Sequence, residues 1–394
     1  MTDTLRAPAR SPLPSIEVSA VAPAAERLHS LDVFRGATIA AMLLVNNPGT
    51  WAAVYPPLRH AEWHGWTPTD LIFPFFLFIA GVAMAFSFGK LLARGETRGR
   101  LLGKSAKRAA ILFALGLVLH SYPWIGYDYS HLRIPGVLQR IALAFLAASV
   151  VVLWSGWRGR IGAIVALLLG YWAVMSWVPV PGIGPGVLEP GQDIGAYLDR
   201  AVFGTDHLWS SSRTWDPEGL LSTLPAVASV LLGVVTGEWL RSGRPRREIV
   251  RGLVVAGTAG VVLGLLWDRL FPINKALWTS SFVVLTAGMA ALGLALCYWV
   301  VDVKGYRRWS LPFTVFGVNA IAAYFLSSLM AQEIGMARLG GEGGDSTVKG
   351  WVFENAFASW LSPVNASLAF AVAFVLFWTG VMWLFYRRRI FIKV

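Results

Sequence analysis

The chain has 394 residues, of which 56% are hydrophobic and 14% are charged. Soluble domains carry about 25% charged residues, so this composition excludes an ordinary soluble protein. The net charge of +12 is explained by Lys and Arg in cytoplasmic loops and not by a nucleic-acid surface, and the single cysteine, Cys297, excludes a disulfide framework or a cysteine metal site.

Repeated apolar runs near the ~20 residues that cross a bilayer predict an all-α, polytopic membrane helix bundle. Backbone groups in lipid must bond within their own segment, so helices are expected in place of strands. We predict about ten spans, at residues 31–48, 71–92, 108–121, 134–154, 160–178, 219–240, 250–268, 276–300, 312–334 and 365–386.

Two of these spans are unusual, because the first contains Asp32 and Arg35 and the third is short. The aromatic stretch 349–361 is interrupted by Lys349 and Glu354. It is expected to form an interfacial or re-entrant helix and not an eleventh span.

The distribution of charge predicts the topology. Residues 1–26, rich in Pro, Ala and Ser, are expected to be a disordered cytoplasmic tail, followed by a single membrane domain over 27–394. Lys and Arg concentrate in alternate loops, which places both termini in the cytoplasm by the positive-inside rule. His60 and the long loop 179–218 then lie on the outer side.

The segment 59–70, between the first two spans, contains two imidazoles and two carboxylates. Ionisable side chains next to a bilayer core are costly and often functional. His60 could be a base or a nucleophile, or an interfacial histidine that hydrogen-bonds a loop. His60 and His64 with Glu62 between them would suit zinc, but a third firm ligand is missing and the segment is not an HExxH motif, so no metal is expected.

Asn46 and Asp70 flank this segment at the ends of the two helices. An amide such as Asn46 at a helix end is commonly a cap, but it could also orient an imidazole or donate to a developing oxyanion. Asp70 would be an ordinary helix N-terminal acid, or a partner that fixes the tautomer of the His60 ring and stabilises its imidazolium.

Further polar residues interrupt apolar runs and are candidates for a site or for structural contacts. Arg140 lies one to two turns into an apolar helix, where a polar cavity or a bound anion is its expected setting. Asn274, Lys275 and Asn319 stand at the ends of other predicted spans. Trp63 would suit stacking on a sugar as well as a place in the aromatic belt.

Basic residues on the cytoplasmic side include Arg35, Lys104 and Arg108. Their ordinary role is to fix topology and to contact lipid phosphates, so membrane lipids are expected partners. Coenzyme A carries several phosphates, and a subset of these side chains could form its entry site.

The sequence resembles the heparan-α-glucosaminide N-acetyltransferase family of multipass membrane enzymes. The resemblance rests on sequence motifs at residues 30–36, 45–46, 60–76, 101–104, 133–140, 216–219, 272–278 and 301–305. It implies acetyl transfer across a membrane, from acetyl-CoA bound from the cytoplasm to the free amine of a glucosamine-type sugar or glycan on the far side. The family's active histidine falls on His60 and a site asparagine on Asn46. We also expect Gln139 and Arg140, in the block 133–140, to bind the coenzyme.

Compared with the animal enzymes, the chain begins with a short tail in place of a large lumenal domain. This departure favours a bacterial version in the cytoplasmic (inner) membrane and makes heparan sulfate itself a doubtful acceptor. The oligomeric state stays open, with a homodimer among the alternatives.

Two mechanisms fit the resemblance. His60 could attack the thioester to give an acetyl-imidazole that the amine then resolves, or it could deprotonate the sugar ammonium for direct attack. The alternative from another functional class is a permease for amino sugars or oligosaccharides, which would move sugar without acetyl-CoA.

Overall fold

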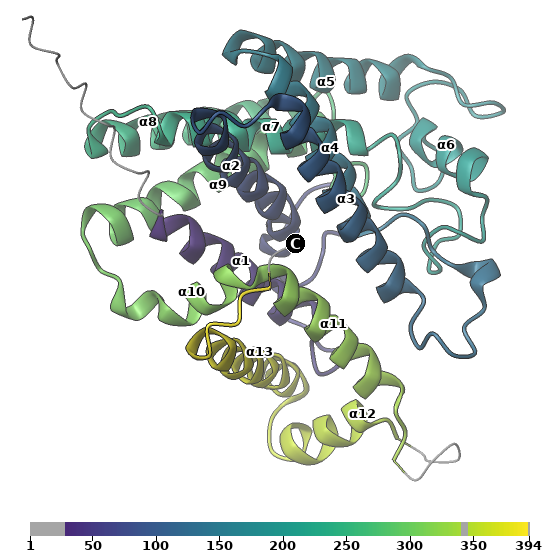
Figure 1. Ribbon diagram of the computed structural model, residues 1–394. Coiled ribbons are helices and arrows are strands. Elements are labelled where there is room, and N and C mark those ends of the chain that lie inside the picture. The colour runs from purple at the N-terminus through teal and green to yellow at the C-terminus, as the bar shows by residue number, and fades with distance from the viewer. Residues whose placement is uncertain (1–27, 340–345, 393–394) are drawn as a thin grey trace, which may run out of the picture.

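The computed structural model describes residues 28–339 and 346–392, and the predicted tail 1–26 lies outside them. In this part of the chain the regular secondary structure is helical, apart from two isolated backbone bridges, and loops connect the helices (Figure 1). The all-α class is therefore confirmed. The α-helices are α1 (His29–Asn46), α2 (Ile72–Ala93), α3 (Arg98–His120), α4 (Val137–Trp154), α5 (Trp157–Trp177), α6 (Ile194–Phe203), α7 (Thr223–Leu240), α8 (Arg246–Trp267), α9 (Ser280–Cys297), α10 (Leu311–Val318), α11 (Ala320–Met336), α12 (Val348–Phe353) and α13 (Pro363–Arg387).

The described residues contain 7 helices that are long and apolar enough to cross a membrane, or 8 if the bent pair α10 and α11 is counted as one span. Their burial separates central from peripheral helices. In α7 and α4, 67% and 61% of the most apolar window is buried inside the protein, against 22% in α5 and α8. The outward faces of α5 and α8 therefore expose apolar side chains that are stable only against lipid, and the chain is a multi-pass membrane protein.

Eight of the ten spans predicted from the sequence fall on these helices when the bent pair α10 and α11 is counted as one span. The predicted spans 31–48 and 108–121 correspond to α1 and α3, which are helices of 18 and 23 residues but are not among the apolar spans. Charged residues within them, such as Arg35 and Arg108, lower their hydropathy. The aromatic stretch 349–361 forms only α12 and a short π-helical segment, Glu354–Ala358, and neither is long enough to cross a bilayer.

The predicted span 312–334 is not continuous. It is broken at Asn319 into α10 and α11, whose axes differ by 74°. Asn319 leaves helical backbone geometry, and its side chain bonds the C-terminal segment instead. Its amide nitrogen donates to the Ile390 carbonyl at 3.0 Å, and its oxygen accepts from the Ile392 amide at 2.9 Å. The segment 390–392 consequently lies beside the α10–α11 junction.

Helix α1 packs directly against α10, and this contact depends on glycine. A side chain on Gly36 would meet the Phe313 carbonyl, and one on Gly317 would meet the Asp32 carbonyl, so the two backbones touch. Small residues allow such close approach between helices in a membrane. The contact holds Arg35 beside the α10–α11 break, where its Nη1 donates to the Gly317 carbonyl at 3.2 Å.

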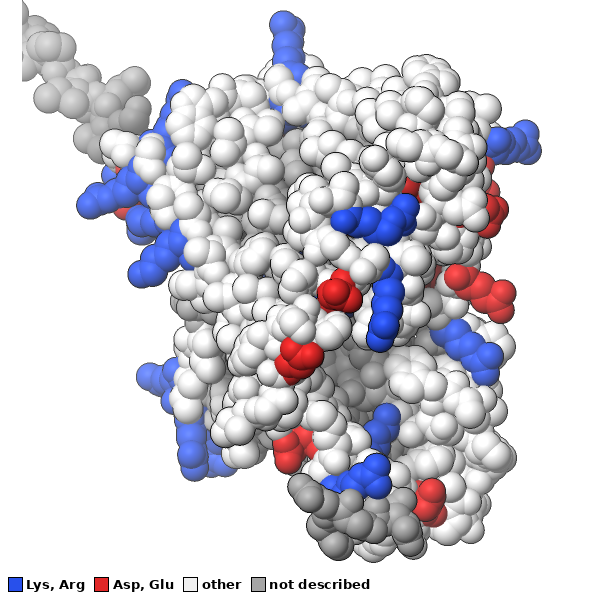
Figure 2. Space-filling model, turned by 90° about the vertical axis from the view of Figure 1, so that its right-hand side faces the viewer, with Lys and Arg blue, Asp and Glu red and all other residues white. Residues whose placement is uncertain are grey.

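Charged side chains are unevenly distributed over the surface. Figure 2 shows Lys and Arg gathered along one edge of the molecule, next to a broad uncharged surface. A continuous uncharged band between polar regions is the surface expected of a protein that sits in a bilayer.

Candidate active site

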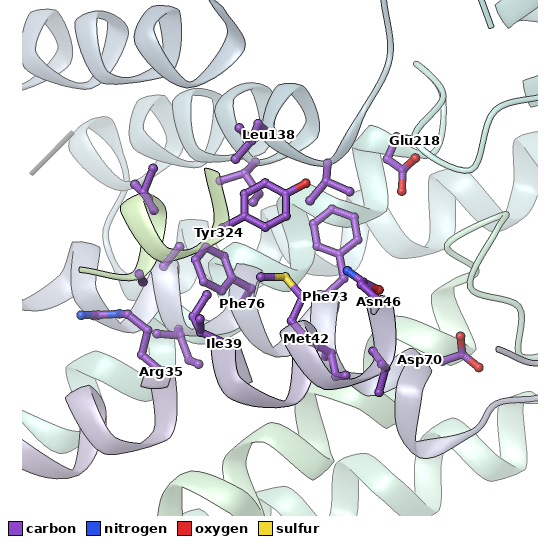
Figure 3. Close-up of a pocket in the computed structure, with 18 of the residues that line it drawn as sticks. Arg35, Ile39, Met42, Asn46, Asp70, Phe73, Phe76, Leu138, Glu218 and Tyr324 are labelled. Atoms are coloured by element: carbon purple, nitrogen blue, oxygen red, sulfur yellow. The ribbon is translucent and has the colours of Figure 1, made fainter. Parts of the chain in front are cut away.

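A large cavity runs through the centre of the bundle. It has a volume of about 1110 Å³ and is lined by α1, α2, α3, α4, the α10–α11 junction, the C-terminal segment and the loops that carry His60, Arg133, Glu218 and Lys275. Ligand pockets usually measure roughly 300–1,000 Å³, so this cavity can hold a large or extended molecule. In Figure 3, Arg35 lies at one end, whereas Asp70, Asn46 and Glu218 lie at the other.

His60 lines the end of the cavity that also contains Asp70, Asn46 and Glu218, and Asp70 holds its ring. The distance from His60 Nδ1 to Asp70 Oδ1 is 2.6 Å. Asp70 is 1% exposed, whereas the His60 side chain is 47% exposed and open to the cavity. A carboxylate only accepts hydrogen bonds when ionised, so Nδ1 carries the proton and Nε2 presents its lone pair.

Asp70 also fixes the loop that carries His60. Its Oδ2 accepts hydrogen bonds from the backbone amides of Ala61 and Thr67, each at 3.0 Å, and from the Thr67 hydroxyl at 3.2 Å. Thr67 and Asp70 form a capping box on the short helix Pro68–Leu71 that opens α2. One buried carboxylate therefore orients the imidazole and starts the helix.

Lys275 approaches the same pair from the loop between α8 and α9. Its Nζ lies 3.0 Å from His60 Nδ1, 3.4 Å from His60 Nε2 and 3.4 Å from Asp70 Oδ1. Burial lowers the pKa of the Lys275 amine, and the attraction of the Asp70 carboxylate offsets only part of this effect. The three side chains form a compact cluster of a carboxylate, an imidazole and an amine at the cavity wall.

Asn46 ends α1 at this side of the cavity. Its side chain is exposed and lines the cavity, and its amide makes no hydrogen bond within the described residues. Figure 3 shows it on α1 beyond Met42 and close to Phe73. The amide is thus available to a molecule in the cavity.

The opposite end of the cavity is basic. Arg35 is 22% exposed and its Nη1 lies 3.3 Å from Asp32 Oδ1. Arg108 also lines the cavity, stacks over the Phe145 ring at 4.8 Å, and has a buried Nε without a hydrogen-bond partner in the described residues. A buried guanidinium nitrogen without a partner indicates that an acceptor from a ligand or water is needed there.

Trp63 belongs to an aromatic row near His60. Its indole nitrogen donates to the Leu188 carbonyl at 2.8 Å, and its ring meets Trp215 edge-on, with 5.0 Å between centroids. Trp215 in turn meets Trp209 at 5.3 Å. All three rings line the main cavity, so Trp63 is one of a set and not an isolated aromatic.

Glu218 also faces the cavity and is tied to Arg133. Arg133 donates to both oxygens of Asp216, at 2.7 and 2.8 Å, and to Glu218 Oε2 at 2.6 Å. Burial alone would lower the pKa of Arg133, but these two carboxylates outweigh it and raise the pKa. The ion cluster anchors the loop before α7 against the start of α4.

Four residues proposed from the sequence lie outside the lining of the main cavity and contact the protein itself. Lys104 is exposed and pairs with Glu96 at 2.8 Å. Arg140 is buried, its Nη2 donates to the Gly219 carbonyl and to the Ser222 hydroxyl, and its guanidinium stacks over Trp278 at 5.0 Å. Its Nε and Nη1 have no hydrogen-bond partner in the described residues.

The other two are amides. Asn274 is fully buried and its oxygen accepts from the Leu277 amide at 2.9 Å, which shapes the turn that presents Lys275. Asn319 binds the C-terminal segment, as described above. A fifth residue, Gln139, lines a separate cavity.

Sequence reasoning missed several residues that line the main cavity. Tyr324 lies in an apolar run and gave no signal, although Figure 3 shows its ring in the centre of the cavity. Phe391 and Ile392 come from the C-terminal segment and line the cavity near the break at Asn319. Glu218, by contrast, lies in an acidic and proline-containing block that interrupts two apolar runs, and this pattern could have identified it.

Asp199 on α6 gives a prediction about stability. It is 2% exposed and its Oδ1 accepts from the Leu220 amide at 2.8 Å. Burial raises the pKa of Asp199 from 3.8 to about 7; the Leu220 amide opposes this rise and Asp216 adds to it. The folded protein keeps a proton that the unfolded chain loses above about pH 4, so the free energy of unfolding should fall between about pH 4 and pH 7.

The variant Asp199→Asn keeps the acceptor oxygen and removes the titration. We expect it to unfold at a higher temperature than the wild type at pH 8, by several degrees, and by a smaller margin at pH 5, in thermal unfolding of the detergent-solubilised protein. Asp206→Asn, at an exposed acid in the loop that follows α6, serves as the control and should follow the wild type. Equal unfolding temperatures of Asp199→Asn and wild type at both pH values would contradict the assignment.

Comparison with known proteins gives consistent matches. Residues 27–262 match the family model described as heparan-α-glucosaminide N-acetyltransferase, catalytic. The heparan-α-glucosaminide N-acetyltransferases of Homo sapiens and Mus musculus are each 30% identical to the chain, over 93% and 76% of its length. The chain spans 60% of the human protein and 53% of the mouse protein.

Proposed function

The chain belongs to the heparan-α-glucosaminide N-acetyltransferase family, and on that premise we propose that it transfers an acetyl group from acetyl-CoA to the amine of a glucosamine-type sugar across a membrane. The observation that carries this proposal is the single cavity, which joins a basic end at Arg35 and Arg108 to the imidazole of His60 at the other end. A molecule with a phosphate-bearing head and a long arm that ends in a thioester suits both ends at once.

We propose that α1 and α3 also cross the membrane, which gives about ten transmembrane segments. Both termini then lie in the cytoplasm, and the membrane is the cytoplasmic membrane of the cell. The charges of α1 do not face lipid, because Arg35 bonds Asp32 and the Gly317 carbonyl and lines the cavity. The basic residues of α3 lie in its first half, where long side chains reach the headgroups. The basic end of the cavity is then cytoplasmic and His60 is on the outer side.

At the cytoplasmic end, Arg35 and Arg108 would bind the phosphates of the coenzyme. Guanidinium groups suit this role because they present several donors in a fixed plane that matches phosphate oxygens. The Nε of Arg108, which has no partner in the described part of the chain, would gain one. The apolar wall between the two ends, formed by residues such as Phe76, Ile79 and Ile141, would enclose the uncharged pantetheine arm.

At the outer end, the lone pair on His60 Nε2 would do the chemistry. In the direct route it takes a proton from the sugar ammonium, the amine attacks the thioester carbonyl, and the C–S bond breaks as His60 returns that proton to the departing thiolate. The new amide nitrogen then gives its second proton to His60, which releases it to water. In the covalent route Nε2 attacks the carbonyl, the thiolate leaves, and the amine then takes the acetyl group from the imidazole. Asp70 holds the ring and balances the imidazolium charge in both.

Asn46 and Lys275 are the donors we assign to the carbonyl oxygen as it gains negative charge. The Asn46 amide lines the cavity without a hydrogen-bond partner in the described residues, and the Lys275 amine lies within 3.4 Å of Nε2. Donors fixed before the reaction stabilise an oxyanion at little reorganisation cost, and loss of one typically reduces kcat by about 10²–10³-fold.

The basic end gives a prediction about the donor. Arg108→Ala is expected to raise KM for acetyl-CoA by about tenfold with kcat within about twofold, since it would remove a contact made equally in the ground and transition states. Lys104→Ala is the matched control, because Lys104 lies on the same helix but pairs with Glu96 outside the cavity. Steady-state kinetics at varied acetyl-CoA would measure both. An unchanged KM in Arg108→Ala, or an equal rise in Lys104→Ala, would contradict the placement of the coenzyme.

The proposed function is tested with purified protein in detergent, acetyl-CoA labelled in its acetyl group, and glucosamine. Labelled N-acetylglucosamine is the expected product. Acetyl-CoA that binds to the protein but reacts with no amino sugar would contradict the acceptor, and failure to bind acetyl-CoA would contradict the enzyme. A single-turnover reaction without acceptor separates the two routes, because only the covalent route leaves label on His60.

A further inference from the structure

A second cavity lies beside the main one and has no part in the function proposed above. It measures about 420 Å³ and is formed by the end of α3, the start of α4, α11 and the loop that carries Trp209. Arg133, Trp209 and Tyr324 line both cavities. The two spaces therefore share a wall on the side where the acceptor amine would enter.

The polar groups of this cavity are not satisfied by the protein. Gln139 is 2% exposed, and its side-chain oxygen has no hydrogen-bond partner in the described residues. Its amide nitrogen lies 3.5 Å from His120 Nδ1, but that nitrogen must already donate to the Arg133 carbonyl at 2.8 Å. The Gln139 amide and the free His120 Nε2 are thus open to a ligand that both donates and accepts hydrogen bonds.

An aromatic row joins this cavity to the reaction centre. Trp63 follows His60 by three residues, its ring meets Trp215 at 5.0 Å, and Trp215 meets Trp209 at 5.3 Å. Trp63 and Trp215 line the main cavity, and Trp209 lines both. Rigid aromatic surfaces with nearby hydrogen-bonding groups suit an amphipathic ring with apolar C–H faces and hydroxyl edges, which describes a pyranose.

The charges around the cavity limit which substituents the bound ring can carry. Its only Lys or Arg lining residue in the described part of the chain is Arg133, whose guanidinium is bound by Asp216 and Glu218. His131, which also lines the cavity, lies 2.9 Å from Asp128 and 3.8 Å from Asp206. The cationic side chains Arg133 and His131 are already paired with carboxylates, so a sulfate or carboxylate on the ligand would find no unpaired Lys or Arg among the described residues that line the cavity.

From these observations we propose that the second cavity binds the next pyranose ring of an acceptor longer than one sugar, and that it selects a ring without sulfate or carboxylate. The proposal rests on the proposed acetyl transfer at His60, where the terminal amine would react. The Gln139 amide and His120 Nε2 hold the ring hydroxyls, and Trp209 separates the two rings.

The test compares three acceptors: glucosamine, the β-1,4-linked disaccharide of glucosamine, and that disaccharide with a sulfate on its second ring. We expect kcat/KM for the unsulfated disaccharide to exceed that for glucosamine by about tenfold or more, and the sulfated disaccharide to lose this advantage. Gln139→Leu, which removes the amide at similar volume, should lower the disaccharide value to about that of glucosamine. Ser210→Trp, which blocks the cavity from an exposed loop position, should do the same without a change in the core.

Gln192→Leu is the matched control, because Gln192 is exposed on the outer loop and lines neither cavity. Equal kcat/KM for glucosamine and its disaccharide, or a disaccharide advantage that survives both Gln139→Leu and Ser210→Trp, would overturn the proposal and leave acetyl transfer intact. If no acceptor is acetylated, the proposed function fails; calorimetry with the unsulfated disaccharide then tests the cavity alone, and binding that Gln139→Leu does not weaken would overturn the proposal.

Discussion

Replacing His60 by alanine is expected to reduce kcat for acetyl transfer by at least about 10³-fold while acetyl-CoA still binds. The reason is the position of the ring: Nδ1 is fixed by Asp70 at 2.6 Å, so Nε2 is the ring nitrogen left to react with a thioester or an amine in the cavity. The measurement is steady-state transfer of labelled acetyl to glucosamine, with acetyl-CoA binding followed by calorimetry in the same preparation.

His64→Ala is the matched control for this variant. His64 lies on the same loop, but its ring contacts Asn274 at 3.4 Å and does not line the cavity. Its removal should change kcat by no more than about threefold, as expected for a residue outside the reacting groups. Full activity in His60→Ala would show that the imidazole is not required, and an equal loss in both variants would assign the effect to the loop and not to the imidazole.

Asp70→Asn is expected to reduce kcat by about 10²–10⁴-fold with little change in KM for acetyl-CoA. An amide at this position can donate to Nδ1 and so favours the tautomer with the proton on Nε2, which removes the lone pair from the cavity side. Asp70 acts through His60, so it is a positioning residue. Its variant should also shift the pH profile of kcat, because the imidazolium loses its balancing carboxylate.

Thr67→Ala separates this effect from a general disturbance of the loop. Thr67 bonds the other oxygen of Asp70 and caps the same short helix, but it does not touch His60. We expect it to lower the unfolding temperature by a few degrees and kcat by less than about fivefold. A kcat loss in Thr67→Ala as large as in Asp70→Asn, with an unshifted pH profile in both, would assign Asp70 a structural role only.

The contact between His60 and Asp70 was within reach of sequence reasoning because it is local. The two residues are ten positions apart on one loop, and the helix start at Asp70 could be predicted from Thr67-Pro68 and the apolar run that follows. The helix positions were predictable for the same reason, since the apolar runs set them. Lys275 was selected as a candidate, but its contact with His60 joins residues 215 positions apart and could not be foreseen.

Other features depended on tertiary contacts that a single sequence does not contain. Arg140 and Asn274 attracted notice as polar residues next to apolar runs, yet each bonds backbone groups of the protein itself. Asn319 was predicted at the start of a span, whereas it breaks the helix because the C-terminal segment returns to bond its side chain. Hydropathy cannot distinguish a polar residue that binds a ligand from one that hydrogen-bonds the backbone of a distant segment.

Hydropathy also fails to identify every helix that can lie within the membrane. Apolar length identifies helices that face lipid, but α1 is surrounded by other helices and tolerates Asp32 and Arg35, which pair with each other. A helix shielded in this way need not be strongly apolar to lie within a membrane. Its charges are also what place Arg35 in the cavity, so the property that weakens the span signal belongs to the site.

Transfer across a closed membrane tests the central claim most directly. Protein reconstituted in vesicles in one orientation would receive labelled acetyl-CoA on the side of its termini and glucosamine only on the other side. The account predicts labelled N-acetylglucosamine on the glucosamine side, none with His60→Ala, and no movement of glucosamine itself. Glucosamine transport without acetyl-CoA would indicate a permease, and a product formed only when both substrates share one side would contradict transfer through the cavity.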